Sequence, residues 1–324
     1  MKNDQSISVI LAAYNADVHI DKAIQSILNQ SFSNFEIIAI DDASTDRTFE
    51  ILNKYKSLDS RIKIIQNKKN LGLAASLNVG IDLASAPFIA RMDADDIAFP
   101  QRLQKQINFL QKNPDIAGCG TSIEVFGASQ GIQKKPKSCQ DIEANLLWGN
   151  PIAHPTVMFR SSILKNIKYD ESFQRAQDYE LWSRMIFDYK LKLANLPEIL
   201  LKYRSTHSSY FIPWHVKVLD NNLSRMGINF SPAELNIHTL LSLSDFKKLR
   251  TQYSDNAIIN WINKFINYSS IKLKDSKKET SNIIYEKLSN YWDRKCFIEN
   301  QKYIKFPNRS IFFYIKLLRN KLRG

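Results

Sequence analysis

The chain has 324 residues, 44% of them hydrophobic, and a formal net charge of +13. This composition is typical of a globular protein with one large domain or two unequal ones. Its three cysteines have no CxxC spacing and are odd in number, which signals neither a zinc site nor a disulfide framework and fits a reducing compartment.

The positive charge is concentrated in the second part of the sequence. Residues 1–189 hold 21 Lys and Arg and 22 Asp and Glu, whereas residues 190–324 hold 24 and 10. A basic half implies an anionic partner, and the candidates are nucleic acid, anionic lipid and a phosphorylated substrate. The sequence begins with no basic segment followed by a long apolar run, and no stretch approaches the roughly 18 apolar residues of a membrane span. We therefore expect a cytoplasmic protein.

Strands and helices alternate four times in the first 111 residues. The apolar runs are continuous rather than alternating, which is typical of a parallel sheet covered on both faces. A further strand is expected over 116–125, followed by a polar loop over 127–137. The sequence thus predicts an α/β fold with strands over 8–13, 35–40, 62–65 and 87–90 and helices over 18–30, 48–55, 74–84 and 99–111.

Polar residues follow these strands where each one ends. Open α/β sheets bind ligands at the carboxyl ends of their strands, so a nucleotide-binding crevice is the natural expectation. No glycine-rich phosphate-binding motif is present, and any phosphates must be held by a metal and by side chains. The residues concerned are Tyr14, Asn15, Asp41, Asp42, Asn70 and the run from Asp93 to Asp96.

The acidic run places three carboxylates in four residues after the strand over 87–90. Carboxylates this close repel one another, and a hard divalent cation would remove that conflict. The alternative is a solvated acidic turn. Arg91 precedes Asp93 by two residues, so strand alternation places both on one face, where Arg91 could bond the acids or reach a ligand.

Four segments, in order and spacing, resemble family 2 glycosyltransferases. They are Ser8-Val9-Ile10 with Tyr14-Asn15, Ile40 to Asp46, Asn70-Leu71-Gly72 with Asn78, and Arg91 to Asp96. The resemblance covers roughly residues 6 to 210. It implies a GT-A fold with a mostly parallel central sheet over 1–212, a nucleotide-sugar donor and inversion at the sugar's anomeric carbon. The remaining 213–324 would form a basic, mainly helical region.

The resemblance also implies a donor site that includes a divalent metal, Mn²⁺ or Mg²⁺. Tyr14 would stack on the base, and Asp42 would accept hydrogen bonds from base or ribose, unless it only caps the next turn. Asp93 and Asp95 would place the metal on the diphosphate, while Asp96 serves the chain turn. His207 would complete the metal site or touch the diphosphate, and Arg204 could contact phosphate. The full set of expected donor residues is Ala12, Tyr14, Asn15, Asp42, Asn70, Gly72, Arg91, Asp93 and Asp95.

Asp178 matches the family's catalytic base, near the start of an expected helix. An inverting transfer needs one group that takes the proton of the acceptor hydroxyl. The alternative is that Asp178 only forms the helix N-cap. Many relatives carry Glu-Asp here, whereas this chain has Gln177-Asp178. On the acceptor side the resemblance implies His154 and Trp182, although His154 could equally be a buried structural residue.

The expected reaction is the transfer of one sugar, from a donor expected to be UDP-linked, to a saccharide acceptor on a lipid carrier. This fits bacterial O-antigen or capsule synthesis at the inner face of the cytoplasmic membrane. Residues 310–324 form an amphipathic basic pattern that could lie on an anionic membrane or pack on protein. Two alternatives stay open, a nucleotidyltransferase of similar fold and a nucleic-acid-binding protein that uses the basic half.

Overall fold

The computed structural model describes residues 6–206 and 212–298, and the chain divides into two compact units. The first unit consists of Met1–Cys139 and Pro151–Trp214, and the second of Gln140–Asn150 and His215–Gly324. The division after Trp214 lies two residues beyond the boundary that the resemblance implied. The excursion over Gln140–Asn150 into the second unit has no counterpart in the sequence prediction.

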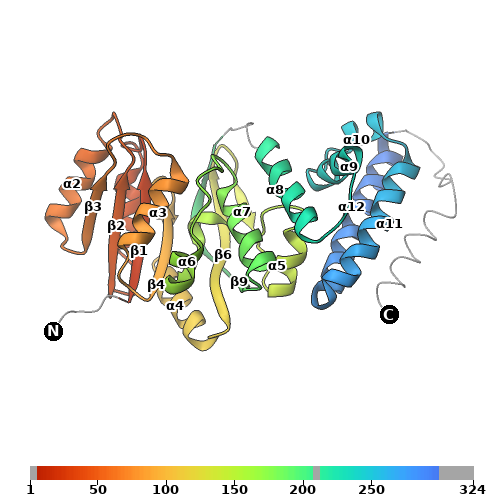
Figure 1. Ribbon diagram of the computed structural model, residues 1–324. Helices are drawn as coiled ribbons and strands as arrows, with labels where there is room; N and C mark the ends of the chain where they lie inside the picture. The colour runs from red at the N-terminus through yellow and green to blue at the C-terminus, as the bar shows by residue number, and fades with distance from the viewer. Residues whose placement is uncertain (1–5, 207–211, 299–324) are drawn as a thin grey trace. The chain divides into compact units, whose positions relative to one another are not determined.

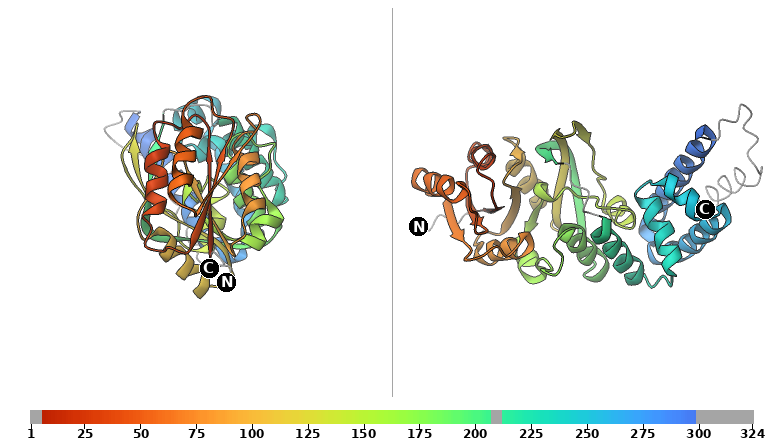
Figure 2. Two further views of the ribbon diagram at one scale, coloured as in Figure 1. Left: turned by 90° about the vertical axis from the view of Figure 1, so that its left-hand side faces the viewer. Right: turned by 90° about the horizontal axis from the view of Figure 1, so that it is seen from above.

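Four parallel strands form the N-terminal part of the sheet in the order β3-β2-β1-β4. Every residue of the two inner strands β1 and β2 is buried, because helices cover both faces of this part of the sheet (Figures 1 and 2). The elements are β1 (Ile7–Ala13), α1 (Ile20–Leu28), β2 (Phe35–Asp41), α2 (Thr48–Leu58), β3 (Ile62–Gln66), α3 (Leu73–Leu83) and β4 (Phe88–Asp93).

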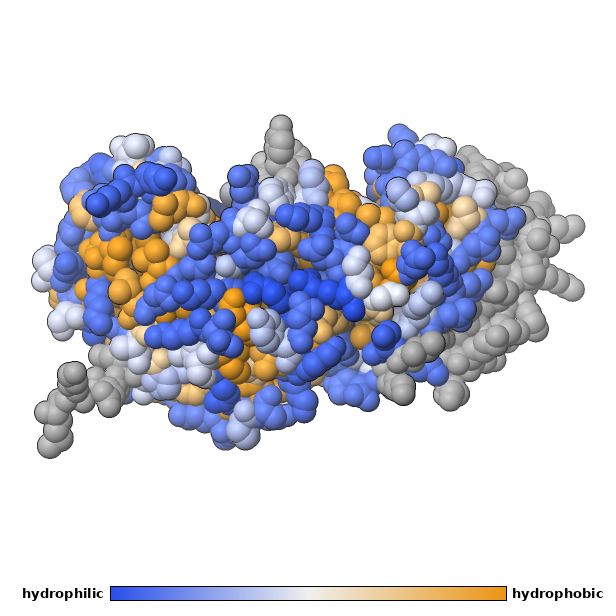
Figure 3. Space-filling view, in the orientation of Figure 1, coloured by the Kyte–Doolittle hydropathy of each residue, from blue (hydrophilic) through white to orange (hydrophobic). Residues whose placement is uncertain are grey.

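Helix α3 lies directly on the sheet. A Cβ atom added to Gly80 would come within 2.6 Å of Ile10 Cγ2 and 2.8 Å of Ile40 Cδ1, so only glycine allows this approach. On the visible face in Figure 3, apolar side chains gather at the surface over this N-terminal part of the sheet, and hydrophilic ones cover much of the rest. The close packing of α3 matters for the site, because α3 carries Asn78.

The sheet continues beyond β4 with strands of mixed direction. Strand β8 pairs antiparallel with both β4 and β6, β6 pairs parallel with β9, and β9 pairs antiparallel with β5. The described residues thus form one nine-stranded sheet, and the predicted α/β fold is confirmed. The predicted loop over 127–137 contains the short strand β7, paired with β6. These strands are β5 (Ile97–Ala98), β6 (Ile116–Gly127), β7 (Gly131–Gln133), β8 (Met158–Arg160) and β9 (Lys192–Ser205).

Short helices connect these strands in the first unit. Helix α7 continues without a break into a π-helical turn, an irregularity that is common near functional sites. The helical elements are α4 (Arg102–Lys112), the 3-10 turn η1 (His154–Thr156), α6 (Ser161–Ile167), α7 (Gln177–Ser183) and the π turn η2 (Arg184–Asp188).

The second unit is built from helices, as the sequence predicted for the C-terminal region. Ser231 and Glu234 form a capping box that starts α9, which satisfies backbone N–H groups at the helix N-terminus. The elements are α5 (Cys139–Asn145), α8 (Ile212–Arg225), α9 (Pro232–Ser242), α10 (Phe246–Gln252), α11 (Asp255–Lys272), the 3-10 turn η3 (Lys274–Ser276) and α12 (Lys277–Ile298).

The turn after α5 forms the centre of this second unit. The backbone carbonyls of residues 146–148 accept hydrogen bonds in order from Asn222 Nδ2 at 2.8 Å, His238 Nε2 at 2.6 Å and Ser242 Oγ at 2.8 Å. Residues 146–148 directly follow α5, where carbonyl groups have no partner within the helix. The three side chains supply the hydrogen bonds that these carbonyls would otherwise lack. The side chains of α8 and α9 therefore hold a segment that is far from these helices in the sequence but belongs to the same unit.

The positive charge of the C-terminal region is divided between residues that the structure describes and residues beyond them. Residues 215–298 contain 13 Lys and Arg and 8 Asp and Glu, whereas residues 299–324 contain 7 and 1. The helix expected over 310–324 lies outside the described residues. Among the described helices, none has the length and apolar character needed to cross a bilayer.

Candidate active site

A cavity of about 610 Å³ opens where β1 and β2 end and α3 begins. Its other wall comes from the segment before α7, with Glu171, Phe173 and Gln174 among its residues. This is the edge of the sheet at which the sequence placed a ligand. Five of the expected donor residues line this one cavity: Ala12, Tyr14, Asp42, Asn70 and Gly72.

Asp42 anchors the loop that forms one wall of the cavity. It is buried, with Oδ1 accepting from Asn67 Nδ2 at 2.7 Å and from the Leu71 N–H at 2.8 Å, while Oδ2 accepts from the Gly72 N–H at 2.9 Å. Gly72 has a φ of 86°, a left-handed conformation that favours glycine. Because each carboxylate oxygen has two lone pairs, Oδ2 can still accept one bond from a ligand.

Tyr14 and Asn15 both follow β1, but Tyr14 lines the cavity whereas Asn15 binds the turn after β2. Tyr14 is 50% exposed and lines the cavity, where its ring is available for stacking. Asn15 adopts a φ of 49° and accepts a hydrogen bond from the Thr45 N–H at 2.8 Å, while its own N–H donates to Ser44 Oγ at 3.0 Å. Asn15 thus joins the turn after β1 to the turn after β2.

The acidic cluster lies at the end of β4. Carboxylate oxygens of Asp93, Asp95 and Asp96 lie within 4.8 Å of one another. The buried Arg91 donates to both carboxylate oxygens of Asp93, so of the two roles considered for Arg91 the contact with the acids is present. This bidentate pair orients Asp93 and leaves further lone pairs on its oxygens.

Asp96 provides the clearest sign that the cluster fits a cation. It is 1% exposed, and its Oδ1 accepts from the Arg204 N–H at 2.7 Å, but its Oδ2 has no hydrogen-bond partner. Burial, reinforced by the charge of Asp93, raises the pKa of Asp96 to about 8 and also raises the pKa of Asp95. Hard divalent cations prefer carboxylate oxygens as ligands. Such a cation would give Asp96 Oδ2 a partner and would offset the repulsion among the three carboxylates.

Two predicted phosphate or metal contacts have different outcomes. Arg204, at the end of β9, donates through Nε to the backbone oxygen of Asp95 at 3.2 Å, and its guanidinium lies 4.5 Å from the ring centre of Phe126. Its side chain therefore supports the acidic turn. His207 lies outside the described residues, and its contribution to a metal site stays a prediction.

Asp178 lies in the first turn of α7 and is half-buried. The N-cap of this helix is Ala176, with a φ of 56°, so the alternative reading of Asp178 as the N-cap is wrong. The charge of Asp178 acts on Lys135, opposing the effect of burial, which lowers the pKa of that ammonium group.

Tyr203 and Tyr169 are both affected by the charge of Asp178 and by charges of the acidic cluster. Burial, with the charges of Asp93 and Asp96, raises the pKa of Tyr203 to about 12, and Asp178 adds to this shift. Burial also raises the pKa of Tyr169, to which Asp178 and Asp93 both contribute. Both hydroxyls thus stay protonated, and both lie in the combined field of the expected base and the expected metal ligands.

His154 and Trp182, expected on the acceptor side, are largely closed to solvent. His154 Nε2 lies 2.8 Å from the Tyr169 hydroxyl, and burial, followed by the charge of Arg91, holds the pKa of His154 well below its usual value. Trp182 is 0% exposed and stacks on Phe159, with the ring centres 5.2 Å apart. The expected contact of Trp182 with an acceptor gains no support from this packing, in which Trp182 instead lies behind His154.

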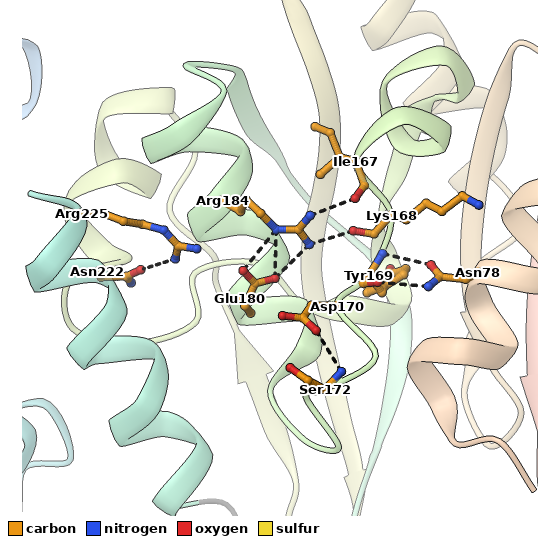
Figure 4. Close-up of polar contacts among 10 residues, drawn as sticks. All are labelled: Asn78, Ile167, Lys168, Tyr169, Asp170, Ser172, Glu180, Arg184, Asn222 and Arg225. Atoms are coloured by element: carbon orange, nitrogen blue, oxygen red, sulfur yellow. Dashed lines mark hydrogen bonds and ion pairs between the residues drawn. The ribbon is translucent and has the colours of Figure 1, made fainter.

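The segment over 168–171, which follows α6, belongs to no strand or helix and is held by side chains, as Figure 4 shows. Arg184 donates to the carbonyls of Ile167 at 2.9 Å and Lys168 at 2.8 Å and is ion-paired with Glu180 at 3.0 Å. Sequence reasoning missed these supports. In the sequence, Glu180 and Arg184 look like an ordinary i,i+4 charge pair on a helix. Nothing in that pattern indicates that Arg184 also binds the carbonyls of residues 167 and 168.

A second buried arginine lies behind the acidic cluster. Arg102 on α4 is 1% exposed and donates to the Arg91 carbonyl at 2.6 Å and to Met92 Sδ at 3.2 Å. Burial, with the charge of Arg91, lowers the pKa of Arg102 to about 10, so the side chain stays charged at neutral pH. It therefore holds the backbone of β4 just before the acids. Its position near the start of an amphipathic helix gave no signal of this role.

The fold is that of the GT-A-type glycosyltransferases. The family model for glycosyl transferase family 2 matches residues 8–168. An uncharacterized glycosyltransferase of Haemophilus influenzae is 40% identical over 218 residues, covering 63% of this chain and 67% of the relative. The chain belongs to glycosyl transferase family 2, and it is a glycosyltransferase.

Two relatives from Escherichia coli have more specific names. The O-antigen biosynthesis glycosyltransferase WbnJ is 37% identical over 63% of this chain and 81% of its own length. The UDP-Glc:alpha-D-GlcNAc-diphosphoundecaprenol beta-1,3-glucosyltransferase WfgD is 33% identical over 64% of this chain and 80% of its own length. Similarity to both is consistent with sugar transfer in polysaccharide synthesis.

Solved structures match the fold over most of the chain. The crystal structure of Staphylococcus aureus TarS 1-349 in complex with UDP has a TM-score of 0.61 at 18% identity and covers 92% of this chain and 93% of that one. The mannosyltransferase PcManGT from Pyrobaculum calidifontis, in complex with GDP-Man and Mn²⁺, has a TM-score of 0.53 at 15% identity, with 89% and 87% covered. At these identities the match is one of fold.

Proposed function

We propose that this enzyme transfers one sugar with inversion from a nucleotide-sugar donor to a hydroxyl of a saccharide acceptor. The observation that carries the proposal is the arrangement in one unit of three elements. They are a cavity with Tyr14 and Asp42 on its wall, an acidic cluster with an orphaned carboxylate oxygen on Asp96, and a separate carboxylate, Asp178.

The donor's nucleoside would occupy the cavity. Tyr14 is placed to stack on the base, and Asp42 offers one remaining acceptor position to a base N–H or a ribose hydroxyl. Asp93 and Asp95, with Asp96 beside them, would hold Mn²⁺ or Mg²⁺. When bound, the cation would neutralise charge on the donor's diphosphate as a Lewis acid.

Asp178 would act as the general base of the transfer. The acceptor oxygen forms a bond to the anomeric carbon from the face opposite the diphosphate, and the bond between that carbon and the diphosphate oxygen breaks with its electron pair. The acceptor's proton passes to the Asp178 carboxylate. The charge of Asp178 acts on the buried ammonium group of Lys135, which therefore belongs to the electrostatic surroundings of the proposed base.

The finer substrate assignment rests on the relatives' names. WfgD is named for a UDP-linked donor and a diphosphoundecaprenol-linked acceptor, and the TarS structure holds UDP. We therefore propose a UDP-sugar donor and a lipid-linked saccharide acceptor in bacterial surface polysaccharide synthesis. A lipid-linked acceptor would bring the enzyme to the inner face of the cytoplasmic membrane, whose anionic lipids could attract the basic C-terminal residues.

Two variants test the assigned division of labour. Asp178→Asn should abolish transfer and leave the dissociation constant of UDP-sugar with Mn²⁺ nearly unchanged, because the base does not hold the donor. Asp95→Ala should weaken that binding itself. Isothermal titration and a transfer assay on the full chain measure the two effects separately. Turnover by Asp178→Asn at the wild-type rate would refute the assigned base.

The nucleic-acid alternative is tested with the same protein. If the wild-type chain bound a short DNA or RNA duplex in a salt-sensitive way, and bound none of UDP-glucose, UDP-N-acetylglucosamine and GDP-mannose with Mn²⁺, the transferase proposal would fail.

A further inference from the structure

Arg175 lies in the segment before α7 and lines the same cavity as Tyr14 and Asp42. It is an exposed residue, and among the described residues it has no hydrogen-bond or ion-pair partner. Of the described residues that line the cavity, three are charged, namely Asp42, Glu171 and Arg175, so Arg175 supplies the positive charge. Its guanidinium N–H groups are therefore available to a ligand in the cavity.

Three other arginines belong to the acidic cluster and are engaged there. Arg91 binds Asp93, Arg204 donates through Nε to the backbone oxygen of Asp95, and Arg102 donates to the Arg91 carbonyl. None of these three lines the cavity. The contact with phosphate that was first expected of Arg204 therefore needs another cation.

Both acids of the cavity wall are held close to α3. Asp42 accepts from the N–H groups of Leu71 at 2.8 Å and Gly72 at 2.9 Å, directly before α3. Glu171 Oε1 accepts from Asn78 Nδ2 on α3 at 2.9 Å. Carboxylates repel phosphate oxygens but accept hydrogen bonds from a base N–H or a ribose hydroxyl. The side of the cavity near α3 thus suits the neutral nucleoside of a donor.

The order of residues along the segment places Arg175 between this side and the proposed base. Glu171 is anchored to α3, Arg175 follows four residues later, and Asp178 comes three residues after that, in α7. In a nucleotide sugar the diphosphate likewise lies between the nucleoside and the anomeric carbon, at which the proposed base acts. The diphosphate also carries the negative charge of the donor, so order and charge both match it to Arg175.

We propose that Arg175 binds the diphosphate of the nucleotide-sugar donor directly. Its planar guanidinium would donate two N–H groups to phosphate oxygens, a geometry that lysine cannot reproduce. This inference rests on the proposed function and adds a contact that does not depend on the metal. Because the diphosphate is also the leaving group, the same contact would offset the charge that develops on it during transfer.

Arg175→Gln tests the contact, because glutamine removes the positive charge and keeps a polar side chain. The dissociation constants of UDP and uridine are measured with the full chain and Mn²⁺, uridine through its displacement of UDP. We expect UDP to bind about tenfold more weakly, since a charge-assisted contact is lost. Uridine should change by less than about twofold, because it has no phosphate for the guanidinium to bind. If GDP binds in place of UDP, GDP and guanosine are compared in the same way.

Arg47→Gln is the matched control, because it removes the same charge from an exposed arginine that is paired with Glu50 and does not line the cavity. It should leave the dissociation constant of UDP at its wild-type value. An unchanged constant for UDP in Arg175→Gln would overturn the inference. So would equal weakening of UDP and uridine, because the residue would then serve the nucleoside or the cavity wall.

Two further measurements show whether the contact is direct. The loss of UDP affinity in Arg175→Gln should persist when Mn²⁺ is left out, and a loss seen only with Mn²⁺ would mean that Arg175 acts through the metal site, against the inference. Arg175→Lys should recover part of the affinity, because it restores the charge without the planar pair of donors. No recovery would contradict a contact based on charge.

Failure of the inference can be told apart from failure of the proposed function. A wild-type chain that bound none of UDP, UDP-glucose and GDP-mannose with Mn²⁺ would refute the proposed function. A wild-type chain that bound UDP, with Arg175→Gln binding it equally well, would refute only the role of Arg175.

Discussion

Asn78 binds the backbone of Tyr169 in both directions. Its Oδ1 accepts from the Tyr169 N–H at 3.0 Å, and its Nδ2 donates to the Tyr169 carbonyl at 3.0 Å and to Glu171 Oε1 at 2.9 Å. One amide on α3 therefore gives residue 169 the two backbone bonds that a neighbouring strand would otherwise provide. It fixes the tyrosine whose hydroxyl meets His154.

Asn78→Asp should damage transfer more than stability. The new carboxylate still accepts from the Tyr169 N–H, but it cannot donate to the Tyr169 carbonyl and it faces the carboxylate of Glu171. We expect kcat to fall roughly a hundredfold, because small misplacements near reacting groups have large effects. The free energy of unfolding should fall by about 1–3 kcal/mol. Steady-state kinetics and urea unfolding measure the two quantities.

Asp82→Asn is the control for this prediction. Asp82 also joins α3 to the same segment, but through an ion pair with Lys168 in which both side chains are more than a third exposed. Exposed pairs contribute little. We expect nearly wild-type kcat, and equal losses of kcat in the two variants would show that Asn78 has no special role.

Gly72→Ala should weaken donor binding by straining the loop that Asp42 holds. The added Cβ meets no atom within 4 Å, so the cost comes from the φ of 86° alone, on the order of 1 kcal/mol. The loop would relax away from the Asp42 carboxylate, and we expect the KM for UDP-sugar to increase several-fold.

Gly131→Ala is matched to this variant. Gly131 has a φ of 146° and equally open surroundings, but it belongs to β7 and does not line the cavity. Both variants should lose a similar amount of thermal stability, and only Gly72→Ala should change KM. A higher KM in both would point to a general loss of folded protein.

Asp96→Asn should stabilise the metal-free protein at high pH but should reduce the stabilisation that a divalent metal provides. The pKa of Asp96, raised to about 8 by burial and by Asp93, means that the metal-free folded state holds a proton that the unfolded state releases near pH 4. Stability from this group is therefore present below about pH 4 and is lost as pH rises toward 8. Without metal at pH 8.5, asparagine avoids this loss, so the variant should melt several degrees above wild type.

The same variant should gain less from Mn²⁺ than wild type does, because one carboxylate of the cluster is missing. Thermal melts at pH 5 and pH 8.5, with and without Mn²⁺, give the four values needed. Asp115→Asn, which alters an exposed acid paired with Lys192, should follow wild type in all four. Identical melting of Asp96→Asn and wild type at pH 8.5 without metal would contradict the raised pKa.

His238 should make the second unit sensitive to acid. Its Nε2 donates to the Leu147 carbonyl at 2.6 Å, and its Nδ1 accepts from Trp261 Nε1 at 3.4 Å, so both nitrogens are used in the neutral form. Burial lowers the pKa of His238 to about 4. The neutral form's stabilisation is complete above about pH 6.5 and is lost as pH falls toward 4, by up to roughly 3 kcal/mol.

His238→Gln should flatten this dependence on pH. Urea unfolding followed by tryptophan fluorescence between pH 4 and 7 gives the slope of stability against pH for each protein. The variant is expected to be less stable than wild type at pH 7 and to lose less on acidification. His19→Gln, at the N-cap of α1, is the control and should keep the wild-type slope. A slope unchanged in His238→Gln would rule out this histidine as the sensor.

The sequence was informative wherever the signal was local. Continuous apolar runs predicted β1 to β4, and the polar residues after them predicted the cavity edge at Tyr14, Asp42 and Gly72, because the carboxyl ends of parallel strands meet at one edge. The spacing of the acids likewise placed Asp93 and Asp95 together with Asp96.

Contacts between distant parts of the chain could not be predicted in this way. Asn78 and Tyr169 are 91 residues apart, and the Arg204 N–H reaches Asp96 across 108 residues. Such pairs leave no periodic pattern in a single sequence. The burial of Trp182 and the place of Arg175 on the cavity wall likewise depend on packing that only the folded chain reveals.

The excursion over Gln140–Asn150 limits where the protein can be truncated. His238 lies 91 residues after the Leu147 carbonyl that it caps, so a chain ended near residue 212 would retain the excursion and lose the side chains from α8 and α9. Three backbone carbonyls and the Trp148 ring would then meet solvent or another molecule. During synthesis the same groups stay uncovered until α9 has left the ribosome, so this part of the second unit can form only after most of the chain has been made.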